Sequence, residues 1–509
     1  MTLKMRNVVL ACLLTTPVVA DDIRFTPIDV PNHVYDGGWE HFVGGGLAVF
    51  DCNDDARPDM IAAGGANPLS LFRNTSEHDI SFVAETIDIT GVSGAYPMDL
   101  DGDAHLDLVL LRVGPDQFLK GNGDCSFSTM SLPGIDFEDQ WTTAFSATWE
   151  PGQTAPTFAF GHYVDRADPT GPFEACDTNT LWRPAQSGYS NTILSPGHCA
   201  LSILFTDWDR SGHADLRVSN DRHYFVRDGR EQLWAMETPP RLFAAEDGWS
   251  EHKLWGMGIA TRDIDRDGRD EVFLSSMGDQ RLMRRQGDGP TFVDVPFDVG
   301  TAAQRPYIGD DGRPSTGWHI AFGDIQNDGR EDVFIAKGNV QQMPGNAMED
   351  PNNLLIQQPD GRFKENGDTA GVASLHRARG AALVDFNNDG LLDLAVVNRR
   401  AALEVWQNTT KTTGHWLSLD VNLEGANTHA VGALIEVEDD QGIQSREITV
   451  GGGHAGGSAV PQHFGLAAND TVRVRVRWPQ GEQSDWIETT SNRRLRITKD
   501  SQNARLTSY

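Results

Sequence analysis

The stretch Asp99-Leu-Asp101-Gly-Asp103-Ala-His-Leu-Asp107 decides the fold of this 509-residue chain. Oxygen-bearing side chains stand at positions 1, 3, 5 and 9 of a nine-residue frame, and glycine permits the sharp turn that the frame needs. Because a short loop with this spacing can point alternate side chains at one hard cation, the pattern predicts a calcium site. We call each stretch of this kind an acidic frame and number its positions 1 to 9.

The chain contains six acidic frames, which predict up to six structural Ca²⁺ ions. Besides Asp99, Asp101, Asp103 and Asp107, the predicted ligands are Asp51, Asn53, Asp55 and Asp59; Asp207, Asp209, Ser211 and Asp215; Asp263, Asp265, Asp267 and Glu271; Asp324, Gln326, Asp328 and Asp332; and Asp385, Asn387, Asp389 and Asp393. Ser211 and Gln326 carry no charge, so we expect weaker binding at 207–215 and 324–332. Calcium sensing and metal-bridged ligand binding are the alternative roles for these frames.

The spacing of the frames indicates a repeat architecture. Their first residues are separated by 48, 108, 56, 61 and 61 residues, so the second gap hides one unit without acids. Residues 145–163 keep the strand character of that unit, and we expect the loop 149–157 to bind no cation. Short apolar strands flank every frame, and helical periodicity is absent. The sequence therefore predicts an all-β fold with a seven-bladed β-propeller over 21–410, its last blade closed by the strand 23–30.

The N-terminus has the pattern of an export signal over residues 1–20. Lys4 and Arg6 precede an apolar stretch from Val8 to Val19, and Ala20 offers a small residue for cleavage. Cys12 raises a less favoured alternative, a lipoprotein anchor. No later apolar run is long enough to span a bilayer, so we expect no transmembrane segment in the mature chain and a periplasmic or secreted location.

Four cysteines remain after removal of the signal, an even number that suits two disulfides in an oxidising compartment. Cys176 and Cys199 lie in one insertion and are the favoured pair. Cys52 and Cys125 form the remaining, less strongly supported pair. The formal net charge of −31 disfavours nucleic acid and anionic membranes as partners and leaves glycans and proteins open.

The C-terminal part has a different character from the repeats. Alternating strands between 411 and 500 surround a glycine-rich stretch at 451–457, the segment His463-Phe-Gly-Leu466 and the turn Trp478-Pro-Gln-Gly481. These motifs resemble the ASPIC/UnbV domain, and the acidic repeats resemble FG-GAP/VCBS units. Together they resemble the cartilage acidic protein family in its bacterial form. The resemblance implies an exported, calcium-loaded propeller, a small β-sandwich-like domain at 411–500 and a tail at 501–509, and it supplies no catalytic motif.

In a propeller of this strand order the acidic frames share one face, and the longer connections lie on the other. Those connections carry aromatic and basic residues that could bind a ligand. The candidates are Trp39, His41, Arg222, His223, Tyr224, Trp255, Tyr307, Trp318 and His319. The alternative for each aromatic residue is packing between blades. His319 stands where a glycine is usual, which predicts a place in the central channel.

These observations favour a calcium-stabilised exported protein that binds a glycan or protein ligand on the face opposite the frames, as in adhesion. One alternative is a propeller-type polysaccharide lyase or glycoside hydrolase, because His, Tyr and Arg stand on suitable loops. No nucleophile elbow, HExxH motif or phosphate loop supports catalysis. A third possibility is an assembly or maturation partner of another exported protein that docks through the C-terminal domain.

Overall fold

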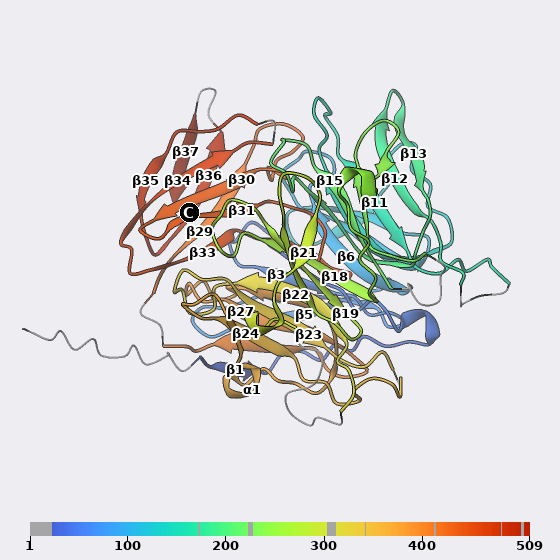
Figure 1. Cartoon of the computed structure of the whole chain (residues 1–509), viewed down its shortest axis with the longest axis horizontal. Coiled ribbons are helices and arrows are strands. Elements are labelled where there is room, and N and C mark those ends of the chain that lie inside the picture. Colours follow the sequence, from blue (N-terminus) through green and yellow to red (C-terminus); the bar gives the residue numbers. More distant parts are fainter. Residues whose placement is uncertain are drawn as a thin grey trace, which may run out of the picture.

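The computed structural model describes residues 23–169, 171, 174–221, 228–302, 312–341, 343–411, 414–479, 481–499 and 503–508. Nearly all regular structure in these ranges is short antiparallel strands (Figure 1). The helical elements described are α1 (Gly367–Ala370) and the 3-10 turns η1 (Trp39–His41), η2 (Ala245–Asp247) and η3 (Phe297–Val299). None of the described helices has the length and hydrophobicity that a membrane span requires.

Residues 25–408 form seven four-stranded antiparallel units, which we call sheets; a short pairing joins the second and third into one eight-stranded sheet. The first holds β2 (Leu47–Phe50), β3 (Asp59–Ala62), β4 (Leu69–Asn74) and β5 (Phe82–Ile87). The second holds β6 (Val92–Met98), β7 (Asp107–Gly114), β8 (Gln117–Gly121) and β9 (Phe127–Met130). The third holds β10 (Gln140–Thr148), β11 (Thr157–His162), β12 (Asn179–Ala185) and β13 (Gly188–Leu194).

The remaining sheets repeat the same order. The fourth holds β14 (Ala200–Thr206), β15 (Asp215–Asn220), β16 (Gln232–Ala235) and β17 (Arg241–Leu242). The fifth holds β18 (Gly256–Arg262), β19 (Glu271–Ser276), β20 (Arg281–Arg285) and β21 (Phe292–Asp294). The sixth holds β22 (Gly317–Gly323), β23 (Asp332–Lys337), β24 (Asn353–Gln357) and β25 (Phe363–Glu365). The seventh holds β26 (Arg377–Val384), β27 (Asp393–Arg399), β28 (Glu404–Asn408) and β1 (Phe25–Ile28).

The sheets stand in a ring around a central channel, as in a β-propeller. Their first strands are neighbours in the order β2, β6, β10, β14, β18, β22, β26 and back to β2. β1 pairs with β28, with Phe25 opposite Asn408 and Ile28 opposite Val405, so the start of the chain supplies the outer strand of the seventh sheet. This pairing removes an open edge from the last sheet of the ring.

Residues 415–508 form a sandwich of two four-stranded sheets. One sheet has the order β33 (Gln462–Ala467), β29 (His415–Asn422), β36 (Arg493–Lys499), β37 (Ala504–Ser508). The other has the order β31 (Gly442–Glu447), β30 (Leu434–Asp439), β34 (Thr471–Arg477), β35 (Ile487–Thr490). Leucine, valine and isoleucine side chains alternate along these strands and fill the space between the sheets.

The tail expected at 501–509 is wrong for the described residues 503–508. β37 pairs with β36, and Leu506 packs partly buried against the core of the sandwich. On this edge strand, Ala504, Leu506 and Ser508 alternate with their neighbours and lie on one side. The polar residues at this end of the sequence obscure the strand pattern.

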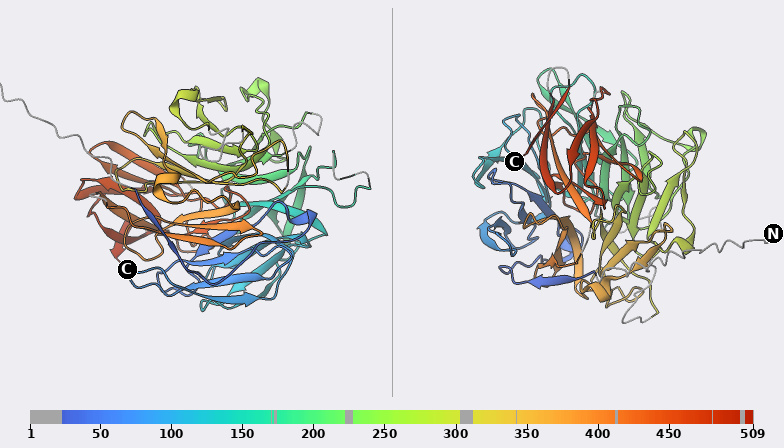
Figure 2. Two further views of the ribbon diagram at one scale, coloured as in Figure 1. Left: turned by 90° about the horizontal axis from the view of Figure 1, so that it is seen from below. Right: turned by 90° about the vertical axis from the view of Figure 1, so that its left-hand side faces the viewer.

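The sandwich lies against one side of the ring (Figure 2) and sends a loop into it. We call residues 450–459, which include β32 (Ser458–Ala459), the plug. Its backbone pairs with the first strands of five sheets: β32 with β2, Gly456 with Ala95, Val450 with Ala147, Gly451 with Leu204, and Gly453 with Ile259. The plug therefore fills the channel and joins the two domains through backbone hydrogen bonds.

The other mouth of the channel is covered by residues 37–45, which we call the cover. Fully buried Arg379 donates hydrogen bonds from Nε and Nη2 to the carbonyl oxygen of Phe42, at 3.0 and 2.9 Å. The Tyr35 hydroxyl donates to the Val43 carbonyl at 2.7 Å. The cover and the plug meet where the Gly44 N–H donates to His454 Nε2 at 3.3 Å. The channel is therefore closed from both sides.

Candidate cation sites and the closed channel

The six acidic frames adopt one common loop geometry. In each, one oxygen of the position-1 carboxylate accepts a hydrogen bond from the backbone N–H of position 6. The donors are Ala56, Ala104, Gly212, Gly268, Gly329 and Gly390, at distances of 2.7 to 3.0 Å. Each frame is therefore folded around its first carboxylate, as the sequence pattern predicts for its loop.

Two backbone positions of every frame have positive φ. Position 4 is Asp54, Gly102, Arg210, Arg266, Asn327 or Asn388, with φ between 57° and 79°. Position 6 is glycine in four frames and alanine in two, with φ of 64° at Ala56 and 72° at Ala104. Glycine adopts this conformation without steric cost, whereas alanine is strained. The positive φ at position 6 therefore explains why the frame pattern has glycine near this position.

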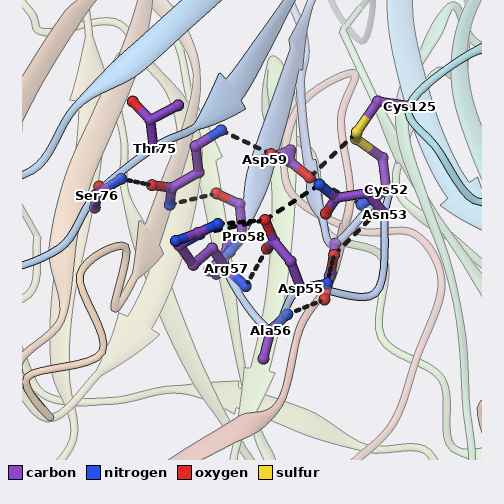
Figure 3. A network of polar contacts seen from close by, with 12 residues as sticks. Cys52, Asn53, Asp55, Ala56, Arg57, Pro58, Asp59, Thr75, Ser76 and Cys125 are labelled. Carbon is purple, nitrogen blue, oxygen red and sulfur yellow. Dashed lines mark hydrogen bonds and ion pairs between the residues drawn. A yellow bond between two sulfur atoms is a disulfide. The ribbon is translucent and has the colours of Figure 1, made fainter.

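In four frames the carboxylate at position 9 accepts one N–H from position 2 of the loop and one from the end of the third strand of the same sheet. In the first frame, Asp59 Oδ2 accepts from the Cys52 N–H at 2.9 Å and Oδ1 accepts from the Asn74 N–H at 2.7 Å (Figure 3). Asp107, Asp332 and Asp393 accept the corresponding pairs of backbone N–H groups. A change in the conformation of the loop is therefore transmitted to the third strand of the sheet.

Amide side chains at the end of the third strand brace adjacent sheets. Asn74 Nδ2 donates to the Phe386 carbonyl at 2.8 Å, and Asn408 Nδ2 donates to the Ile325 carbonyl at 2.9 Å. Phe386 and Ile325 are both position 2 of the frame in the preceding sheet. These braces connect the frames around the ring.

The predicted ligand oxygens gather closely enough to hold a cation. Asp99, Asp101 and Asp107 offer oxygens within 4.8 Å of one another, as do Asp263, Asp265 and Glu271. Asn387 is 8% exposed, and its Oδ1 has no hydrogen-bond partner among the described residues. An unpartnered carbonyl oxygen beside carboxylates is the donor that Ca²⁺ requires, so the residues present fit this ion. Asp59 lies beside a cysteine pair that is oxidised and offers no thiolate.

Burial raises the pKa of the frame carboxyls. It raises the pKa of Asp107 and Asp263 to about 6, of Asp59 and Asp385 to about 7, and of Glu271 to about 8. In the frame at 324–332, burial and the mutual repulsion of the carboxylates raise the pKa of Asp324 and Asp332 well above its usual range. Ionised carboxylates packed this way need a counter-charge, which a divalent cation provides.

The C-terminal domain covers the frame side of the ring. The Thr428 hydroxyl donates to Asp99 Oδ2 at 2.6 Å, and Glu447 accepts from the Asp207 N–H at 3.0 Å. The buried Arg446 guanidinium pairs with Glu331 at 2.5 Å. A cavity of about 120 Å³ lies between the frames at 51–59 and 99–107 and the sandwich, lined by both domains. The frame face is therefore largely an interface within the molecule.

The predicted ligand-binding residues on the opposite side differ in their exposure to solvent. Trp39 is 47% exposed on the cover, where its ring stacks on Phe42 with 4.6 Å between centroids. His41 and Trp255 are half-buried. Arg222, His223, Tyr224 and Tyr307 lie outside the described residues.

Trp318 and His319 do not form part of a ligand face. Trp318 is fully buried, donates from Nε1 to the Gly338 carbonyl at 2.7 Å and lies under the Arg379 guanidinium. His319 does lie in the channel, but its Nδ1 accepts from the His454 N–H at 3.0 Å. The plug occupies the space that an open channel would have offered. Trp318 is therefore packed, as the alternative interpretation for the aromatic residues has it, whereas His319 lies in the channel against the plug.

Neither the plug nor the cover was predicted from the sequence, although glycines in the first strands indicate the plug. A Cβ on Gly46 would lie 1.7 Å from the Ala455 carbonyl oxygen, and one on Gly94 would lie 2.1 Å from it. Glycines inside buried strands indicate close approach of another backbone. Here that backbone is the plug, whose own glycines at 451–457 pass between the first strands.

The buried histidines predict a loss of stability in acid. Burial lowers the pKa of His319 to about 4, and burial with the nearby Arg379 lowers that of His454 to about 3. The unfolded chain binds these protons near pH 6.5, so stability is complete above that pH and falls between about 6.5 and 3. Urea unfolding in millimolar calcium at pH 7, 5.5 and 4.5 measures this fall.

The variant His454→Gln tests the assignment. It is expected to reduce the slope by up to about 1.4 kcal/mol per pH unit, because glutamine keeps a donor and an acceptor without titrating. A slope identical to that of the natural protein would show that His454 does not carry the effect.

Both predicted disulfides are present. Cys52 joins Cys125 with a Cα–Cα distance of 4.8 Å, linking the first frame to the second sheet, and Cys176 joins Cys199 at 4.7 Å. Two disulfides are consistent with an oxidising compartment.

Comparison with known proteins agrees with the two-part architecture. The model of the ASPIC and UnbV family matches residues 423–504, and that of the FG-GAP-like repeat matches 51–110 and 263–335. Cartilage acidic protein 1 of Mus musculus is 24% identical over 246 residues, which cover 47% of this chain and 36% of that protein. Its Homo sapiens counterpart is 25% identical over 245 residues, covering 47% and 35%. The match thus spans about a third of the length of these relatives.

Among solved structures, a BBS1N–ARL6DN complex matches with a TM-score of 0.43 and 10% identity, covering 75% of this chain and 97% of that chain. The S. cerevisiae core factor matches with a TM-score of 0.43 and 8% identity, covering 78% and 62%. The family models find FG-GAP-like repeats and an ASPIC/UnbV domain in this chain, and the relatives show weak homology to cartilage acidic protein 1.

Proposed function

We propose that this protein is an exported, calcium-stabilised binding protein that recognises a glycan or protein ligand on the propeller face opposite the acidic frames. The observation that carries the proposal is the division of the two faces. The sandwich covers the frame face, whereas the cover displays half-exposed Trp39 on the other side of the channel. A partner therefore has this second face available.

Trp39 has the properties of a binding anchor. Its ring is held by stacking on Phe42 and by an edge contact with buried Trp141, with 6.0 Å between centroids. Arg166 lies beside it, paired with Glu40 of the cover through a 2.9 Å contact. A rigid aromatic ring with polar neighbours suits the face of a sugar or a side chain of a protein partner.

The calcium part of the proposal rests on the six frames. Their fixed geometry, the raised pKa values of their carboxyls and the unpartnered Asn387 Oδ1 support cations as structural components. When bound, Ca²⁺ supplies positive charge to these loops. The frame residues themselves orient the loops and tie them to the sheets.

The proposal is tested with the variant Trp39→Ala on a glycan array probed with calcium-loaded mature protein. Loss of a central aromatic anchor costs about 2 kcal/mol or more, so we expect binding to weaken on the order of thirtyfold. Phe297→Ala is the control, because Phe297 is 74% exposed in η3 and belongs to neither the cover nor the plug.

Equal binding by Trp39→Ala, with an unchanged melting temperature, would remove Trp39 from the ligand face. Release of shortened sugars from array polysaccharides would overturn the binding role in favour of a lyase or hydrolase.

A further inference from the structure

The side chain at position 4 of an acidic frame reaches the next frame around the ring. Asn388 Nδ2 donates to the Ala56 carbonyl at 3.2 Å, and Asn327 Nδ2 donates to the Gly390 carbonyl at 2.9 Å. Arg266 Nη2 donates to the Gly329 carbonyl at 2.5 Å. In all three contacts the acceptor is position 6 of the neighbouring frame.

Two further pairs of frames are joined through other positions, one by an ion pair and one by a carboxylate–imidazole contact. Arg210 Nη2, at position 4, lies 2.8 Å from an oxygen of Asp270, at position 8 of the next frame. Asp54, at position 4, lies 3.3 Å from Nδ1 of His105, at position 7 of the next frame. Five links therefore connect six frames, although the side chains that make them differ in chemistry.

The series of links has two ends. Position 4 of the frame at 99–107 is Gly102, which has no side chain, and the third sheet that follows has no acidic frame. The frames therefore form an open chain in the order 207–215, 263–271, 324–332, 385–393, 51–59 and 99–107. The chain begins and ends on either side of the third sheet.

We propose that the position-4 side chains make cation binding cooperative between neighbouring frames, an inference that rests on the proposed calcium role. The position-4 residue holds a positive φ only within the folded loop, so a cation that orders one frame also fixes the side chain that reaches out of it. In three of the five links that side chain holds the position-6 peptide of the next frame, and in the other two it contacts position 8 or position 7 of that frame. The N–H of position 6 binds the position-1 carboxylate of the same frame, so the second cation meets a loop that is already ordered.

The link between 385–393 and 51–59 offers the cleanest test. Asn388→Gly removes the amide and keeps the left-handed backbone, for which glycine is the best residue. The Ala56 carbonyl retains a 2.7 Å hydrogen bond from Arg494 Nη1, so the change leaves no buried acceptor without a donor. Glu174→Gly is the matched control, because exposed Glu174 also has positive φ but lies in the connection between β11 and β12, outside the frames.

The measurement is hydrogen exchange of the full mature chain, followed by mass spectrometry at increasing Ca²⁺ concentration. Peptides from the six loops give a separate midpoint of protection for each frame. In Asn388→Gly we expect the midpoints of 385–393 and 51–59 to rise about fivefold, the low end of typical coupling between sites. The frames at 207–215 and 263–271 are three and two links distant from the cut and should keep their midpoints. The control Glu174→Gly should shift none.

The outcomes separate the two proposals. Calcium-dependent protection with no shift in Asn388→Gly, or with an equal shift at all six loops, overturns the cooperative chain and leaves the calcium role standing. Absence of calcium-dependent protection in the natural protein overturns both.

Discussion

Removal of calcium is expected to lower the melting temperature of the mature protein by at least about 15 °C. A site filled at a hundred times its dissociation constant contributes about 2.7 kcal/mol, so six sites together contribute on the order of 10 kcal/mol. Without the ions the carboxylates of each frame repel one another, and the braces to adjacent sheets lose their anchored loops. Scanning calorimetry in millimolar calcium and in excess EDTA measures the difference.

A single ligand gives the corresponding local test. Asp389, at position 5 of its frame, is exposed, so Asp389→Ala should have little effect in EDTA and lose up to about 2.7 kcal/mol in calcium. Asp298→Ala, which removes an exposed carboxylate with 67% side-chain exposure outside the frames, should have no calcium-dependent effect. Similar melting temperatures of the natural protein in calcium and in EDTA would refute a structural role for the cation.

The second large effect is expected from a methyl group at the plug. In Gly46→Ala the new Cβ would lie 1.7 Å from the Ala455 carbonyl oxygen and 3.0 Å from Gly94 Cα. Both neighbours are backbone atoms held by surrounding sheets, so no side chain can turn away to make room. We expect a loss of at least about 4 kcal/mol, measured by urea unfolding, or release of the plug.

Release of the plug and loss of the whole fold can be distinguished. Trp318 lies 4.9 Å from the His454 ring and Trp416 lies beside His463 in the sandwich, so hydrogen exchange of the peptides that contain each tryptophan reports the two places separately. Gly345→Ala is the control, because its Cβ would meet no atom within 4 Å and its φ is not positive. Unchanged stability of Gly46→Ala would show that the plug does not hold its place in the channel.

The acidic frames and the flanking strands could be predicted from the sequence because each is a local pattern. Nine consecutive residues contain the carboxylates and turn of Asp99–Asp107, and two apolar runs beside them provide the hairpin. The strand 23–30 could be assigned to the last sheet because that sheet otherwise lacked a strand. The disulfide of Cys176 and Cys199 followed from their shared insertion.

The closed channel could not be predicted from the sequence, because its contacts join residues that are hundreds of positions apart. Gly44 meets His454 across 410 residues, and Arg379 meets Phe42 across 337. Trp318 and His319 are aromatic and polar, as ligand residues often are, and only the position of the plug shows that they are packed. The position-4 links were hidden for a different reason: Asn388, Arg266 and Asp54 share a backbone position and a direction, but no chemistry.

The pairing of β1 with β28 also has a consequence for the order in which the protein can be completed. The two strands are separated by more than 370 residues. The first strand of the ring can therefore pair only after the last strand of the ring has been synthesised. Such distant pairing is slow to form and leaves strand edges exposed in the meantime. The plug, at 450–459, is synthesised later still. Growing chains that stop before residue 450 therefore lack the segment that occupies the centre of the ring.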